Sequence, residues 1–126
     1  HRATAYARDR KVFGGPIGRN QGIQFPLARA HAETEAAELM AKKAAALFDC
    51  GAPCGAEANM AKLLCAETAW RAGEACMQTF GGFAFAREFD IERKWRECRL
   101  FRTAPVSNNL VLAYIGQHVL KLPRSY

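Results

Sequence analysis

The sequence predicts an all-α fold with the architecture of an antiparallel (up-and-down) four-helix bundle. Alanine is frequent and β-branched residues are sparse, which favours helix over strand. Apolar residues recur with a helical period in two long and two shorter segments, and no segment alternates as a strand would. The connections between these segments are short, as they are between antiparallel neighbours in a bundle. At 126 residues, the chain is predicted to form one domain over residues 1–126.

The first part of the chain predicts the end of one helix, a loop and a long helix. Residues 1–10 have the composition of the last turns of a helix, and the glycine-rich residues 11–22 predict a loop. The long helix is expected over residues 22–49, with Pro26 in its first turn, where a missing N–H costs little. Its core-facing stripe is predicted to be Ala36, Ala37, Met40, Ala44, Leu47 and Phe48.

A second long helix is expected over residues 56–80, after a tight connection in which Gly51 is the C-cap. Large apolar residues alternate with small alanines along it, which predicts closely packed neighbours. Gly81 and Gly82 end this helix, and an aromatic-rich connector follows them.

Two shorter helices complete the predicted bundle. The third is expected over residues 89–101, with Asp90 as its N-cap or as an acid in its first turn. The fourth is expected over residues 106–121, after Pro105 has interrupted the helical pattern. Its apolar face is predicted to be Val111, Ile115, Val119 and Leu122.

Charge and composition restrict the function classes. The formal net charge is +6, but the 18 basic and 12 acidic residues are interspersed, so a nucleic-acid partner is not expected. No apolar run is long enough for a membrane span, and no histidine pair has metal-ligand spacing. Five cysteines without a Cys-x-x-Cys pair predict a reducing, cytoplasmic setting, with Cys65 and Cys76 as buried thiols.

Three stretches contain residues that could bind an anion. Arg10 lies in a basic cluster before the glycine-rich loop, Gln78 precedes a Gly-Gly pair, and Ser107 begins a run of polar residues at a helix start. Each stretch also has a purely structural interpretation. These are dipole-favourable cations at a helix end, an ordinary helix stop, and a capping serine followed by asparagines that face water.

In their order along the chain, these stretches resemble the C-terminal helical domain of acyl-CoA dehydrogenases. The resemblance rests on "YARDRKVFGGPIGRNQGIQFPLA" (residues 6–28), "QTFGGFAFAREFDIERKWRECRLFR" (residues 78–102) and the terminal "LPRSY". It implies a longer FAD-dependent enzyme that oxidises an acyl-CoA thioester to the 2,3-enoyl-CoA and passes electrons to an electron-transferring flavoprotein. It also implies dimers or tetramers formed through such bundles. The chain alone is expected to be inactive, because it would lack the other domains.

The resemblance also assigns residues to FAD of a neighbouring subunit. Arg10 matches an arginine at the pyrophosphate, Phe13 an aromatic residue nearby, and Gln21 a flavin-contacting glutamine.

Further matches fall in the second half of the chain. Gln78, Gly81 and Gly82 match positions where a glutamine and bare backbone reach the neighbour's FAD. Ser107 and Asn109 match positions that touch FAD of the same subunit. The chain is therefore expected to help build two flavin sites.

The chain departs from the resemblance at the catalytic base. Many relatives carry a glutamate where this chain has Pro105, and proline cannot accept a proton. Some relatives carry the base upstream of the segment that matches residues 1–10, so the catalytic residue is unknown. The alternative is a non-catalytic helical bundle that serves oligomerisation or partners a catalytic subunit.

Overall fold

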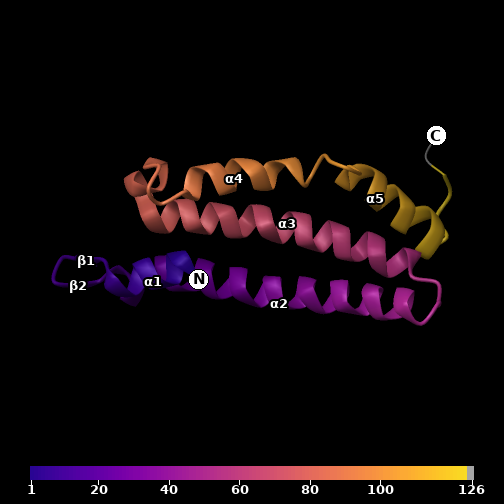
Figure 1. Ribbon diagram of the computed structural model, residues 1–126, viewed down its shortest axis with the longest axis horizontal. Helices are drawn as coiled ribbons and strands as arrows, with labels where there is room; N and C mark the ends of the chain where they lie inside the picture. Colours follow the sequence, from indigo (N-terminus) through magenta and orange to yellow (C-terminus); the bar gives the residue numbers. More distant parts are fainter. Residues whose placement is uncertain (125–126) are drawn as a thin grey trace.

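The computed structural model describes residues 1–124 and is mostly helical (Figure 1). A two-stranded hairpin separates the first helix from the rest. The α-helices are α1 (Arg2–Asp9), α2 (Gln21–Asp49), α3 (Gly55–Phe80), α4 (Ile91–Leu100) and α5 (Asn108–Tyr114). The shorter elements are β1 (Lys11–Val12), β2 (Gly15–Pro16), the 3₁₀ helices η1 (Ile17–Arg19) and η2 (Gly81–Phe85), and the π-helix η3 (Ile115–Val119).

Helix α3 occupies the middle of the molecule and packs against α1, α2, α4 and α5. Figure 1 shows α2 antiparallel to α3 on one side, with α4 and α5 end to end along the other. The order up, down and up again confirms the predicted all-α, up-and-down architecture. No described helix in residues 1–124 is long and apolar enough to cross a membrane.

The buried core gathers at the end of α3 that carries Phe80. Phe80 packs with Ala3 of α1, Ala84 of η2 and Ile91 of α4. Its ring stacks on Tyr6, with the ring centroids 4.1 Å apart. This aromatic cluster joins α1 to the end of α3 and so fixes the surfaces that both present at this end of the molecule.

The structure contains a β-hairpin where the sequence predicts only a loop. Lys11 pairs with Pro16 and Val12 with Gly15, in antiparallel register. The two turn residues, Phe13 and Gly14, have φ values of 50° and 76°, as a type I′ turn requires. The absence of strands was therefore wrongly predicted. Strands of two residues are too short to produce an alternating pattern.

Two predictions for α2 are wrong. Pro26 lies one turn inside the helix, because α2 begins at Gln21. The carbonyl that loses its partner belongs to Gly22, which is exposed and can bind water instead. Ala36 and Phe48 of the predicted core stripe are also exposed, and the Phe48 side chain is 74% exposed. The buried stripe is narrower than the predicted one because only α3 covers α2 along most of its length.

The predicted fourth helix also differs from the observed one. Helix α5 begins at Asn108 and continues as a π-helix from Ile115, so the pitch changes partway. The wider turn rotates the side chains of the π-helix, and Val119 is exposed. Leu122 lies beyond the end of the π-helix and is exposed as well, so neither residue shares the buried face with Val111. The "LPRSY" stretch extends beyond the described residues at its last two positions.

Of the two cysteines predicted to be buried, one is exposed and the other is half-buried. Cys65 is exposed on α3, and its thiol donates to the carbonyl of Ala37, so its predicted burial is wrong. Cys76 is half-buried beside the aromatic cluster, and burial raises the pKa of its thiol.

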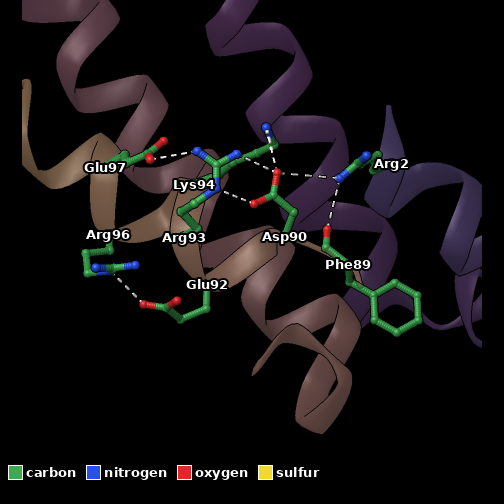
Figure 2. A network of polar contacts seen from close by, with 8 residues as sticks. All are labelled: Arg2, Phe89, Asp90, Glu92, Arg93, Lys94, Arg96 and Glu97. Carbon is green, nitrogen blue, oxygen red and sulfur yellow. Dashed lines mark hydrogen bonds and ion pairs between the residues drawn. The ribbon is translucent and has the colours of Figure 1, made fainter. Parts of the chain in front are cut away.

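A network of charged side chains holds the corner where α4 begins (Figure 2). Asp90 is the N-cap residue, as predicted, but its carboxylate does not cap the helix. It accepts from Arg93, with 2.8 Å between Oδ2 and Nη2, and pairs with Lys94 at 3.2 Å. Arg2 of α1 lies 4.0 Å from Asp90 Oδ2 and donates to the carbonyl of Phe89. The network therefore ties the start of α1 to the corner that follows η2.

Asp90→Asn is expected to lower the free energy of unfolding at neutral pH, and by less as the pH falls below about 4. Hydrogen bonds from Arg93 and Lys94 hold the pKa of the Asp90 carboxyl well below its ordinary value. Its stabilising effect is therefore complete above the unfolded pKa, about 3.9, and declines as the pH falls below it. Asparagine tolerates the φ of 61° at this position, so the variant removes mainly the charge.

Urea unfolding of wild type and Asp90→Asn at a series of pH values measures this effect. The difference in the free energy of unfolding is expected to narrow steadily below about pH 4. A difference independent of pH would show that the ion pairs are not its source.

Candidate functional site

A shallow cavity of about 600 Å³, wide open to solvent, lies where α1, the hairpin, the start of α2 and the end of α3 meet. Four of the residues predicted to bind a cofactor line it: Arg10, Gln78, Gly81 and Gly82. The other lining residues are Tyr6, Val12, Ile17, Asn20, Ile23, Thr79, Phe80 and Phe83. The wall thus combines one cation, two side-chain amides, two side-chain hydroxyls and apolar surface. None of the described lining residues carries a carboxylate.

Arg10 is positioned by its backbone on both sides. Its N–H caps α1 by donating to the carbonyl of Tyr6 at 2.8 Å, and its carbonyl accepts from the Ile17 N–H at 2.9 Å. Its guanidinium lies over the ring of Phe83, with Cζ 5.3 Å from the ring centroid. Within residues 1–124 the guanidinium has no carboxylate partner, so its N–H groups are available to an anion.

The backbone at the cavity depends on glycine at Gly81, which lines it, and at Gly18, which follows the lining residue Ile17. Gly81 ends α3 with a φ of 57° and a ψ of −133°, a conformation that only glycine adopts readily. Its N–H donates to the carbonyl of Met77 and caps the helix. Gly18 lets η1 approach α1 closely, because a Cβ there would lie 2.8 Å from the carbonyl oxygen of Ala7.

Two predicted residues of this group do not line the cavity. Phe13 stands at the tip of the hairpin and is 96% exposed, so it points away from the body of the chain. Gln21 is exposed at the first position of α2, between the lining residues Asn20 and Ile23. Asn20 and Ile23 were missed because the sequence shows only that the segment starts a helix.

The remaining predicted residues lie near the turn that contains Pro105. Ser107 caps α5, since its Oγ accepts from the Leu110 N–H at 3.3 Å, and Asn109 is exposed. The Ala104–Pro105 peptide bond is cis. The structural interpretation of Ser107 as a cap is confirmed. That interpretation also had both asparagines facing water, which is wrong for Asn108, because it is only 7% exposed.

Lys62 of α3 binds this turn by hydrogen bonds, a role that the sequence did not predict. Its Nζ donates to the Phe101 carbonyl at 2.8 Å and to Asn108 Oδ1 at 2.6 Å. Asn108 Nδ2 is buried without a hydrogen-bond partner among residues 1–124. The available signal was a single lysine within an otherwise apolar stretch of α3, Ala61 to Cys65.

The two groups of predicted residues form separate regions of the surface. Gln78 lines the cavity and Lys62 reaches the Pro105 turn, so the two regions are about 24 Å apart along α3 at 1.5 Å per residue. This separation is what we expect of a chain that contributes residues to two distinct cofactor sites.

Residues 1–124 contain no group of three or more His, Cys, Asp or Glu side chains that could hold a metal ion.

Comparison with known proteins identifies the family. Residues 1–120 match the sequence model described as "Acyl-CoA dehydrogenase, C-terminal domain". Because this match spans nearly the whole chain, the protein belongs to the acyl-CoA dehydrogenase family through its C-terminal helical domain. The predicted resemblance is thereby confirmed.

Individual relatives agree with this assignment. Acyl-CoA dehydrogenase FadE12 of Mycobacterium tuberculosis is 44% identical over 99% of this chain and 33% of its own length. The FAD complex of PigA superimposes with a TM-score of 0.91 at 29% identity, over 95% of this chain and 31% of that chain. Butyryl-CoA dehydrogenase from Megasphaera elsdenii gives the same TM-score and identity, over 94% of this chain and 31% of that chain. The chain thus spans about a third of the length of these relatives.

Proposed function

We propose that the chain is the C-terminal domain of a longer FAD-dependent acyl-CoA dehydrogenase, with residues 1–126 forming one helical domain. The observation that carries the proposal is the convergence of Arg10, Gln78, Gly81 and Gly82 on one cavity. These residues come from separate elements, and family membership alone does not require them to share a cavity in this chain. The substrate class is an acyl-CoA thioester, which the oxidised flavin would convert to the 2,3-enoyl-CoA.

The residues of the cavity fit the pyrophosphate portion of FAD and the atoms beside it. The Arg10 guanidinium would hold pyrophosphate, and the amide of Gln78 offers a donor and an acceptor. At Gly81 and Gly82 the space beside the backbone is open, so a ligand can approach the main chain there. When bound, FAD supplies the acceptor for the hydride. The chain's own residues bind and orient it.

We assign the two surface regions to two cofactors. The cavity at Arg10 would take FAD of a neighbouring subunit, with Phe13 and Gln21 reaching it from the hairpin and the start of α2. Ser107 and Asn109 would contact FAD of the same subunit. The separation of the regions along α3 supports this assignment. It also supports a homo-oligomer, a dimer or tetramer, in which the bundles meet.

The source of the base distinguishes this proposal from its alternative. The turn over residues 101–107 contains no carboxylate, and Pro105 has none to offer. In the enzyme we propose, the base comes from another part of the longer protein. The specific observation at Pro105 equally favours a non-catalytic bundle that serves oligomerisation or a catalytic partner. An electron-transferring flavoprotein would be the partner that accepts the electrons. The cytoplasmic location of the protein stays a prediction.

Arg10→Gln in the longer protein tests the proposal. Removing a guanidinium that binds pyrophosphate is expected to weaken FAD binding about 10- to 100-fold, since a hydrogen bond to a charged group contributes about 1.5–3 kcal/mol. FAD affinity is measured by titrating the apoprotein with FAD. Activity is measured with an acyl-CoA substrate and an artificial electron acceptor.

Arg8→Gln provides the matched control. Arg8 is an exposed arginine in the last turn of α1 that does not line the cavity, so its loss is expected to leave FAD affinity unchanged. Equal FAD affinity of Arg10→Gln and wild type would contradict the proposed cofactor site. A protein that binds FAD but fails to oxidise any acyl-CoA would favour the non-catalytic alternative.

A further inference from the structure

Arg10 contacts a cluster of aromatic rings that extends to the buried core. Tyr6 stacks on Phe80, and the Phe80 and Phe89 ring centroids lie 5.2 Å apart. Phe89 in turn meets Phe83 edge to face, with 5.7 Å between the centroids. The guanidinium of Arg10 covers the Phe83 ring.

Phe83 fixes a side chain that no other group holds. The Arg10 backbone is hydrogen-bonded on both sides, but within residues 1–124 its guanidinium makes no hydrogen bond or ion pair and stacks on the Phe83 ring. The flexible arginine side chain would otherwise sample many rotamers and lose them on binding an anion. A guanidinium stacked on an aromatic face keeps the N–H groups at its edge free for such an anion.

The exposure of Phe83 also calls for an explanation. Its side chain is 46% exposed and lines the cavity, although smaller apolar residues could fill the same position beside Phe89. Phe85 of the same 3₁₀ helix is exposed as well but does not line the cavity. Phe83 is thus the aromatic residue of η2 that can act on the cavity.

We infer that Phe83 is a positioning residue for cofactor binding, which orients the Arg10 guanidinium toward the phosphates of the ligand in this cavity. The inference rests on the proposed function, in which that ligand is FAD. Phe83 acts through Arg10 and stays in place when the ligand binds. The aromatic cluster makes this orientation part of the folded core, because the Phe83 ring is itself held by Phe89.

A double-mutant cycle in the longer protein tests this role, with the dissociation constant for FAD as the measurement. Phe83→Leu is expected to raise the dissociation constant about two- to fivefold, the effect of losing an exposed cation–π contact. Phe83→Tyr keeps an aromatic face and is expected to restore wild-type affinity. In the Arg10→Gln background, Phe83→Leu is expected to have no further effect. Phe85→Leu is the matched control and is expected to bind FAD like wild type.

The outcomes separate the inference from the proposed function. Additive effects of Phe83→Leu and Arg10→Gln would overturn the inference, because a purely structural role of Phe83 does not depend on the arginine. Wild-type affinity of Phe83→Leu, together with weak binding by Arg10→Gln, would overturn the inference and leave the proposed function standing. A wild-type protein that does not bind FAD would overturn both. Thermal unfolding of Phe83→Leu and Phe85→Leu shows whether the two variants are equally stable.

Discussion

Phe80→Ala is expected to lower the free energy of unfolding by about 3–5 kcal/mol, the usual result of removing a buried aromatic ring. Phe80 is only 6% exposed and is the largest residue of the buried cluster with Ala3, Ala84 and Ile91. Its ring also stacks on Tyr6, so its loss leaves a cavity between α1 and α3. The neighbouring Ala3 and Ala84 are too small to fill that space.

The effect of Phe80→Ala is measured by urea unfolding, with Phe48→Ala as the control. Phe48 is also a phenylalanine of a long helix, but it is 74% exposed, so its removal is expected to change stability little. FAD binding should weaken as well in the Phe80 variant, because Phe80 and Tyr6 both line the cavity. Similar stabilities for the two variants would contradict the placement of the core at this end of α3.

The sequence predicted those features that depend on local patterns. Helix α3 starts one residue before its predicted beginning and ends at the predicted Phe80, where Gly81 supplies the stop. Ser107 caps α5 as its residue type suggests. Such signals lie within a few neighbouring residues, so they can be read without the fold. The four cofactor residues at the cavity were identified by resemblance, and their convergence required the structure.

The features that the sequence could not predict depend on tertiary packing. Phe48 and Leu47 are neighbours in the same apolar pattern, and only the position of α3 decides which of them is covered. Lys62 meets Asn108 across 46 residues of sequence, and no local rule connects them. The contact between Arg10 and Phe83 likewise joins two distant segments. Charged and aromatic partners of this kind become visible only when the helices are placed.

Lys62→Met is expected to lower the free energy of unfolding by about 2 kcal/mol, because it leaves the side-chain oxygen of the buried Asn108 without its donor. Methionine has a similar length and keeps the apolar part of the contact, so the variant removes chiefly the ammonium group. The largest effect is expected at Asn108. Its Oδ1 loses the hydrogen bond from Lys62, and its Nδ2 already lacks a partner among residues 1–124. The Phe101 carbonyl loses the same donor.

The loss of stability caused by Lys62→Met should be concentrated at residues 101–107, the turn that joins α4 to α5. Amide hydrogen exchange is expected to accelerate there and at the start of α5, while the cavity at Arg10 stays protected, because it lies about 24 Å away along α3. Lys42→Met is the matched control, since Lys42 makes an exposed pair with Glu38 on α2 and its loss should change stability little. Faster exchange spread evenly over the chain would argue against a local role. If exchange accelerates only at the turn, Lys62 sets the position of Ser107 and Asn109, and with it the second cofactor contact that we propose.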